Sequence, residues 1–362
     1  MSGSSISGPY THERTSISRT MLWVMAALTP ATAYGIYQFG LPALWLFLIT
    51  IFSCVWIEAG CLYIAGKPIK PYLADGSAIL TGWLLAMTLP PWAPWWIAVV
   101  GAALAIIVGK QVFGGIGQNL FNPAMVARVA LLISFPLEMT TWVMPHPLFS
   151  ANTPGLIESL RITFDLQTTF DATSSATLLG HIKTEVGRGL ELSEVLVDTF
   201  NPVQLTLGNV SGSLGETSAL LILIGGLVLL FLRIISWHIP VAMMATIALL
   251  ATLFHWIDPQ HYPHALYHLL SGATLLGAFF IATDLVTSPV TKLGQLIFGA
   301  GCGLLVFVIR TWAGYPEGMA FAVMLMNGFT PMIDHYVRPR IYGRTRKGKP
   351  LSYATEAENS ND

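Results

Sequence analysis

The sequence predicts an all-α polytopic membrane protein with about ten transmembrane helices, which form two inverted five-helix repeats on either side of an extramembrane insertion. Apolar and aromatic residues make up 54% of the 362 residues and charged residues only 10%, against about 25% charged in an ordinary soluble domain. Ten helices of about 20 residues need roughly 200 residues, which agrees with the apolar fraction. This composition excludes a soluble globular protein.

The charge and the cysteines exclude further classes. The net charge of -1 provides no basic field for a nucleic acid. The three cysteines, Cys54, Cys61 and Cys302, all lie within apolar segments, so neither a disulfide framework nor a metal site is predicted, and we interpret them as packing residues.

The first membrane repeat is predicted at residues 20–136, after a polar tail at 1–19. No small-residue cleavage site follows this tail, so it is not a signal peptide. Five apolar segments, several of them short or broken by Gly and Pro, follow at 20–39, 41–65, 77–89, 91–109 and 122–136.

A long polar stretch, residues 137–216, separates the two halves. It holds nine of the 19 acidic residues, and its bases are only Arg161, Lys183 and Arg188. We therefore predict that this stretch is an extramembrane insertion.

The second membrane repeat is predicted at residues 217–336, before a basic tail at 337–362. Its apolar segments are 217–235, 238–254, 268–283, 294–312 and 316–333. Because cytoplasmic loops are rich in Lys and Arg, the basic termini should be cytoplasmic. With ten spans, the acidic insertion then faces the periplasm.

Similar patterns in the two halves suggest an internal repeat. Ala78, Leu80, Gly82 and Thr88 recur with the same spacing as Ala273, Leu275, Gly277 and Thr283, and Asn119, Phe121 and Pro123 recur as Asn327, Phe329 and Pro331. Five spans in each half turn the second copy upside down. Inverted repeats of this kind are typical of transport proteins, whose sites lie where broken helices meet near the midplane.

The insertion contains the segment Asp171-Ala-Thr-Ser174-Ser175-Ala-Thr177. By local rules it is a turn or a helix start, because Asp, Ser and Thr cap backbone amides. It also resembles the acceptor motif for covalent attachment of FMN through a threonine phosphoester, in which the last threonine, here Thr177, is modified. We expect Thr177 at an exposed loop position, where substitution changes stability by only about 0.5 kcal/mol.

A second segment, Gly114 to Arg128, opens the fifth span. Its GxG spacing is weak support for a phosphate loop, because no strand precedes it. Glycines for close packing, followed by an Asn/Pro helix start, are one interpretation. In the other, the amides of Asn119 and Asn122 hydrogen-bond the polar edge of a planar cofactor, since neutral groups cost less to bury than charges.

Several motifs together resemble one family along residues 20–345. They are Asn119-Leu-Phe-Asn122-Pro, the Thr177 segment, Ala282-Thr-Asp284 with Thr287-Ser-Pro, Gly314-Tyr-Pro-Glu317-Gly-Met-Ala-Phe-Ala and Arg338-Pro-Arg-Ile-Tyr-Gly343. The chain resembles the family of the D subunit of the bacterial Rnf electron-transport complex, which is similar to the B subunit of the sodium-translocating NADH:quinone reductase. Leu285 stands where that family often has proline.

The resemblance implies an ion-pumping complex of the bacterial inner membrane that moves electrons between NADH and ferredoxin and translocates Na⁺ or H⁺. This subunit would carry covalent FMN at Thr177, with Asp171, Ser174 and Ser175 completing the acceptor motif, and a riboflavin near Asn119 and Asn122. The resemblance implies no catalytic residue and no metal in this chain, and the isolated chain is expected to be inactive.

The implied partners are the other Rnf subunits of A, B, C, E and G type, including a second FMN-bearing subunit. Three scattered cysteines cannot supply the four ligands of an iron–sulfur cluster, so such clusters belong to partner subunits. Membrane lipid and a flavin transferase complete the expected partners, and no nucleic acid is among them.

Ionisable residues within predicted spans are functional candidates. Glu58 is the candidate for an ion pathway, because it lies nine residues before Lys67 and so about 13 Å inside the predicted cytoplasmic end. The alternative is a structural carboxylate satisfied by hydroxyl groups or a neighbouring base. Five other charges lie near predicted span ends, where we expect snorkelling or topology signals: Lys110, Arg128, Asp284, Arg310 and Asp334.

A different class of function is a channel or secondary transporter for a small solute. The ten spans and the inverted repeat would also fit that class. It predicts solute flux by the isolated chain and no bound flavin, and it leaves the Thr177 segment without a role.

Overall fold

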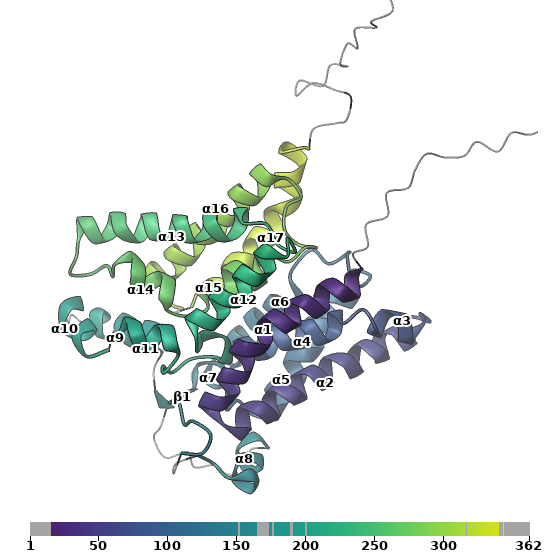
Figure 1. Ribbon diagram of the computed structural model, residues 1–362, viewed down its shortest axis with the longest axis horizontal. Coiled ribbons are helices and arrows are strands. Elements are labelled where there is room, and N and C mark those ends of the chain that lie inside the picture. The colour runs from purple at the N-terminus through teal and green to yellow at the C-terminus, as the bar shows by residue number, and fades with distance from the viewer. Residues whose placement is uncertain are drawn as a thin grey trace, which may run out of the picture.

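The computed structural model describes residues 16–150, 153–164, 174–175, 177–188, 191–199, 201–315, 317–339 and 343. All ten predicted apolar segments fall on helices. The prediction of an all-α fold is confirmed, and the only strands among the residues described, β1 (Trp142–Val143) and β2 (Ser174–Ser175), form a short antiparallel ladder. Figure 1 shows this arrangement, with the insertion on one side of the helical body.

The first half of the chain is built around the long helix α2, which packs against α4, α5 and the π-helix that follows α5. Its elements are α1 (Ile17–Phe39), α2 (Leu41–Ile64), α3 (Ile69–Leu73), α4 (Ser77–Thr88), α5 (Trp95–Ala103), η1 (Leu104–Gln111), α6 (Pro123–Ser134) and α7 (Pro136–Thr140). The local sequence explains the start of α6, where Asn122 accepts hydrogen bonds from two backbone amides and Pro123 takes the first helical position.

The insertion consists of short elements. After β1 come α8 (Leu156–Thr163), β2, α9 (Leu178–Gly187), α10 (Leu192–Thr199), α11 (Pro202–Leu207) and the 3₁₀-helix η2 (Leu214–Glu216). Helices α9 and α10 share a small apolar core with Tyr267 of α14 (Ala265–Leu270). The helix α8 lies instead against α2, so the insertion touches both halves of the molecule.

The second half continues with α12 (Ala219–Phe231), α13 (His238–Ile257), α14, α15 (Thr274–Leu276), the π-helix η3 (Gly277–Ile281), α16 (Lys292–Trp312) and α17 (Met319–Tyr336). Helices α13 and α16 lie side by side because glycines remove side chains from their contact. A Cβ atom on Gly299 would stand 2.6 Å from the carbonyl oxygen of Ile239, and one on Gly303 2.6 Å from that of Met243. Any larger residue would push these helices apart.

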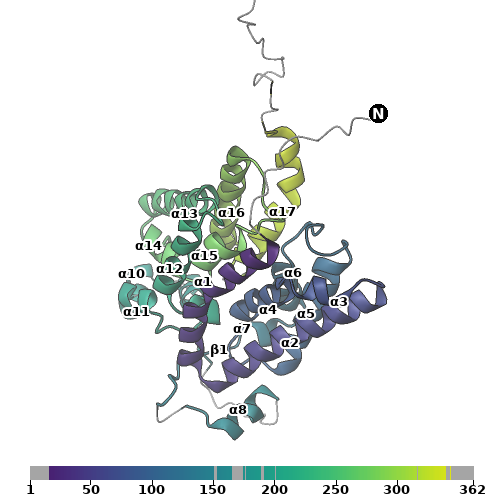
Figure 2. The same cartoon turned by 45° about the vertical axis from the view of Figure 1, so that its right-hand side comes forward.

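Helix α1 joins the two halves. It contacts α4 in the first half and α12 in the second, and Figure 2 shows it running between them. Helix α6 makes a second connection through α17. One continuous apolar core therefore contains buried residues of both halves.

Three of the helices described are long and apolar enough to cross a membrane: α2, α13 and α16. Helices α4 and α6 have 12 residues each, a length of about 18 Å, which is shorter than the ~30 Å hydrocarbon core. Short helices of this kind end inside the molecule, where their free backbone groups can face a cofactor or a polar cavity.

Candidate functional site

A cavity lies at the start of α6, between the two halves of the molecule. Both predicted amides, Asn119 and Asn122, line it. Its wall also contains Lys110, Phe279, Phe280 and Asp284. Its lining combines aromatic rings with a few polar groups, as is typical of cofactor sites.

The two asparagines have different roles in this cavity. The Oδ1 atom of Asn122 accepts from the backbone amides of Ala124 at 3.1 Å and Met125 at 3.4 Å, so the interpretation as a helix start is confirmed for this residue. Asn119 donates from Nδ2 to the carbonyl oxygen of Phe121 at 3.1 Å. Among the residues described, no donor reaches Asn119 Oδ1, which leaves this oxygen available to a ligand.

Two π-helices contribute to the same cavity, and the sequence analysis missed both. Lys110 comes from η1, and Phe279 and Phe280 come from η3. Although π-helices are rare overall, those that occur often lie at functional sites. A hydrophobic pattern cannot reveal it, because an apolar π segment and an apolar α segment have the same composition.

Glu58 is part of a buried polar network beside this cavity. Its carboxylate accepts from Lys110 Nζ at 2.6 and 2.9 Å and from Gln111 Nε2 at 3.0 Å, and both Glu58 and Lys110 are 2% exposed. Lys110 also donates to Ser77 Oγ at 2.6 Å, and Ser77 donates to the partly exposed Asp75 at 2.5 Å. The neighbouring base Lys110 thus satisfies the carboxylate of Glu58, which agrees with the alternative interpretation of Glu58 as a structural carboxylate.

The prediction of snorkelling charges was wrong for three residues. Lys110 is 2% exposed, Arg128 7% and Arg310 5%. Each is held inside by the fold: Lys110 by Glu58, Arg310 by Glu317 and two carbonyl groups, and Arg128 by its packing in α6. Their positions near span ends did not reveal this, because burial depends on the packing of other helices.

Asp284 and Asp334 are the other two charged residues predicted near span ends. Both are only partly buried, and both stabilise turns. Asp284 accepts from the amide of Val286 at 3.3 Å and from the hydroxyl of Thr287 at 3.1 Å. Asp334 accepts from the amide of Val290 at 3.2 Å. The turn at Asp284 therefore forms with Leu285 in place of the proline that is frequent there.

Thr177 begins helix α9. Its Oγ1 atom accepts from the amide of Gly180 at 3.2 Å, so the expectation of a helix start is confirmed. The expectation of an exposed position was wrong, because Thr177 is 5% exposed. Ser174 and Ser175 form β2, which pairs with β1 through the backbone, and Asp171 lies outside the residues described.

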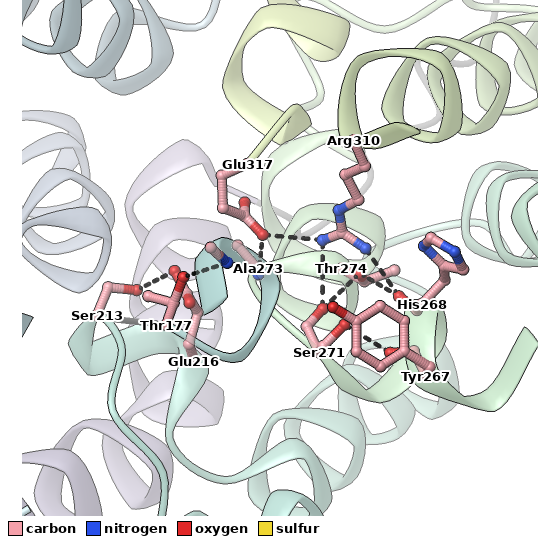
Figure 3. A network of polar contacts seen from close by, with 11 residues as sticks. Thr177, Ser213, Glu216, Tyr267, His268, Ser271, Ala273, Thr274, Arg310 and Glu317 are labelled. Carbon is pink, nitrogen blue, oxygen red and sulfur yellow. Dashed lines mark hydrogen bonds and ion pairs between the residues drawn. The ribbon is translucent and has the colours of Figure 1, made fainter. Parts of the chain in front are cut away.

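Thr177 lies beside acidic and basic groups that the sequence analysis did not connect with it. It lines a small cavity together with Glu216 and Ser271. Figure 3 shows Thr177 and Glu216 on one side of Glu317, with Arg310 on the other. These groups could not be connected by sequence, because they come from elements far apart along the chain: α9, η2, the segment between α14 and α15, the end of α16 and the segment between α16 and α17.

Lys183 fixes α9, and with it Thr177, against α16. Its Nζ atom donates to the carbonyl oxygens of Arg310 at 3.0 Å and Tyr315 at 3.2 Å, and to that of Ala313. These groups end or follow α16, where free carbonyl oxygens favour a positive charge. Burial lowers the pKa of Lys183 below its ordinary value.

The two carboxyl groups beside Thr177 are held differently. Glu317 accepts from Arg310 at 2.8 Å and from the amide of Ala273 at 3.2 Å, whereas Glu216 accepts only from Ser213, at 2.7 Å, among the residues described. Burial raises the pKa of Glu216 to about 7, and the negative charge of Glu317 adds to this shift. The hydrogen bond from Ser213 and the positive charges of Arg128 and Arg310 oppose it.

Comparison with known proteins assigns this fold to a family. The sequence model of the "NQR2, RnfD, RnfE family" matches residues 4–343. The chain belongs to the NQR2, RnfD and RnfE family. The resemblance inferred from the motifs is thereby confirmed at the level of the family.

Individual members of the NQR2, RnfD and RnfE family are similar over nearly the whole chain. The D subunit of the ion-translocating oxidoreductase complex of Halorhodospira halophila is 54% identical over 96% of this chain and 97% of its own. The protein of the same name from Stutzerimonas stutzeri is 57% identical over 93% and 95%. That of Escherichia fergusonii is 42% identical over 94% and 98%.

Proposed function

We propose that this chain is the D-type subunit of an Rnf-like ion-translocating oxidoreductase complex and that it carries electrons through two flavins. The observation that carries the proposal is the similarity to D-type subunits over at least 93% of the chain in three bacteria. The two sites described above supply the residues that such a role requires. The isolated chain is inactive as an oxidoreductase, because electrons enter and leave through partner subunits.

The Thr177 site fits covalent FMN. The hydroxyl group of Thr177 stands at the start of the ten-residue helix α9, whose first amides and positive dipole end favour a phosphate. Bound FMN supplies one- and two-electron transfer. The ladder between β1 and β2, together with Lys183, holds the acceptor segment in place for that group.

The cavity at the start of α6 fits a non-covalent riboflavin. The rings of Phe279 and Phe280 line an apolar part, while Asn119 and Lys110 supply polar groups. The isoalloxazine ring of a flavin is flat and apolar except for one edge of hydrogen-bond donors and acceptors. Its site therefore needs both an apolar surface and a few polar groups. In this proposal Asn119 Oδ1 contacts that edge, and Asn122 holds the backbone that forms the wall.

We further propose the membrane arrangement and its division of the chain. Residues 20–136 and 217–336 form the two inverted membrane repeats, residues 137–216 the periplasmic flavin-bearing insertion, and residues 1–19 and 337–362 the cytoplasmic tails. The distribution of charge supports this orientation, since the two tails hold eight of the 18 Lys and Arg residues and the insertion only three. In Figure 1 the insertion lies away from the start of α1 and the end of α17.

Glu58 is our candidate for the ion pathway. The chain of contacts from Asp75 through Ser77 and Lys110 to Glu58 leads from a partly exposed carboxylate to a buried one. Because Ser77 and Lys110 also line the cavity, the network connects the proposed flavin with the surface on the side of α3.

Mass spectrometry of the full chain tests the flavin assignment. The wild-type chain from cells that contain the flavin transferase should carry one covalent FMN, and Thr177→Val should carry none. Since Thr177 caps α9, Thr177→Val also costs about 1 kcal/mol of stability. Thr177→Asn retains a capping oxygen without the hydroxyl group, so it should fold better and still lack FMN.

A matched control uses the exposed hydroxyl group of Thr184 in the same helix. Thr184→Val should retain covalent FMN at the wild-type level. FMN that persists on both Thr177 variants would place the attachment elsewhere, and a wild-type chain without flavin that conducts a solute would favour a transporter.

A further inference from the structure

Arg128 is a buried cation without a full set of partners. It lies in α6, is 7% exposed, and donates one weak hydrogen bond, from Nη1 to Met139 Sδ at 3.7 Å. Within the described part of the chain it forms no ion pair and no hydrogen bond to an oxygen atom. A guanidinium group has five donors, and burying it without acceptors costs several kcal/mol.

The position of Arg128 connects it with the acceptor segment. Its guanidinium carbon lies 6.0 Å from the centre of the Trp142 ring. Trp142 belongs to β1, and its partner in the ladder is Ser175, two residues before Thr177. Arg128 therefore packs against the strand that positions Thr177.

The buried charges on this side of the molecule are not all paired by direct contact. Arg310 and Glu317 form an ion pair at 2.8 Å, which balances both. Glu216 lines the cavity of Thr177 and is hydrogen-bonded to Ser213, and Arg128 acts on it electrostatically without touching it. The structure thus holds a buried guanidinium beside the strand that pairs with the Thr177 segment, and this guanidinium lacks an anion in direct contact.

We propose that Arg128 is the counter-ion of the phosphodiester that joins FMN to Thr177. This proposal rests on the flavin attachment proposed above and adds a positioning residue to it. A phosphodiester carries one negative charge and two unesterified oxygens, which match the paired donors of a guanidinium group. The first backbone amides of α9 would be further donors to the same phosphate.

This assignment explains a feature that packing alone does not. A methionine or leucine at position 128 would fill the space beside Met139 and Trp142 without the cost of burying a charge. A buried cation at this position stabilises the chain only when an anion binds beside it. Attachment of FMN supplies that anion, so the same residue should destabilise the chain before attachment and stabilise it afterwards.

The test is a thermodynamic cycle on the full-length subunit. Wild type and Arg128→Met are each purified from cells with and without the flavin transferase, and intact mass establishes whether FMN is attached. The melting temperature of the four species is then measured in the same detergent. Arg161→Gln, which removes an exposed arginine from α8 of the insertion, is the matched control.

We expect the effect of Arg128→Met to change sign. Without FMN the variant should melt at or above the temperature of the wild type. With FMN it should melt lower by about 4 °C, the shift expected for one lost charge-assisted hydrogen bond in a chain of this size. Arg161→Gln should have the same small effect in both states.

Two results separate the failure of this inference from that of the proposed function. Absence of covalent FMN from the wild type would refute the flavin assignment itself. Covalent FMN that stabilises wild type and Arg128→Met equally would overturn only the role of Arg128. If Arg128→Met does not accumulate, Arg128→Lys is measured instead: FMN should stabilise it about half as much as the wild type, and equal stabilisation overturns the proposal.

Discussion

At the scale of single residues, the buried ion pair of Glu58 and Lys110 determines how substitutions at either position change the stability of the fold. Both side chains are 2% exposed, and the two oxygens of Glu58 lie 2.6 and 2.9 Å from the ammonium group. Desolvation of two buried ions offsets most of their attraction, so the intact pair adds little net stability. Removal of one partner, by contrast, leaves the other charge buried and unpaired.

We expect Glu58→Met and Lys110→Met each to reduce the free energy of unfolding by about 3–5 kcal/mol. The double variant should lose much less than the sum, because no charge is then left alone. Melting curves of the purified subunit check this. Additive losses would show that the two groups are not coupled in the folded protein.

Glu216 should give stability a pH dependence. Its pKa is about 7 in the folded chain and 4.5 ordinarily. Between these values the folded state keeps a proton that the unfolded state has released, so stability falls as the pH rises from about 4.5 to 7 and is level above that. The loss amounts to at most about 3 kcal/mol.

Glu216→Gln removes this loss, since glutamine does not titrate. The variant should match the wild type near pH 5 and melt at a higher temperature near pH 8, compared at equal flavin content. An equal difference at both pH values would contradict a raised pKa of Glu216.

The sequence revealed the candidate site residues that belong to a local motif. Thr177 as a helix start and Asn122 before Pro123 follow from capping preferences that act over three residues. The burial of Arg128 and the proximity of Glu216 to Thr177 could not be predicted, because both depend on contacts between elements far apart in sequence.

At the scale of elements, α6 begins at one proposed flavin site and passes beside the other. Asn122 at its start lines the cavity proposed for riboflavin, and Arg128 lies six residues further, about 9 Å along the axis. Loss of the cap at Asn122 would thus disturb both sites, so the cavity is better tested at Asn119, which caps no helix.

Asn119→Leu should strongly reduce the riboflavin that co-purifies with the assembled complex, because it removes the oxygen available to the polar edge of the ring. Covalent FMN should be unchanged. Extraction of non-covalent flavin followed by chromatography measures the first quantity, and intact mass the second. Gln118→Leu, at an exposed neighbouring position, is the control that should retain riboflavin.

The hydrophobic pattern located the ten apolar helical segments but not their internal form. The predicted span 268–283 consists of α14, α15 and the π-helix η3, and the span 91–109 of α5 and most of η1. Composition determines that a segment is apolar, whereas the backbone hydrogen bonds that distinguish π from α depend on neighbouring helices. The insertion was recognised by its charge, and its short helices required the structure.

At the scale of the whole molecule, the orientation in the membrane can be tested by labelling. In a background without cysteine, Glu194→Cys in α10 should react with an impermeant thiol reagent in intact spheroplasts. Arg338→Cys, after α17, should react only when the membrane is opened. Both positions are exposed, so accessibility of the side chain does not differ between them. The reverse pattern would overturn the proposed topology.

The separation of Glu58 and Lys110 by 52 positions has a consequence for biogenesis. Helix α2 leaves the ribosome before η1 has been synthesised, so Glu58 reaches the bilayer without its ammonium partner. A lone charged side chain at the centre of a membrane helix costs about 2.5–3.5 kcal/mol on insertion scales. Embedding of α2 is therefore less favourable until η1 arrives, and a nascent chain that fails to bring them together keeps this cost in the membrane.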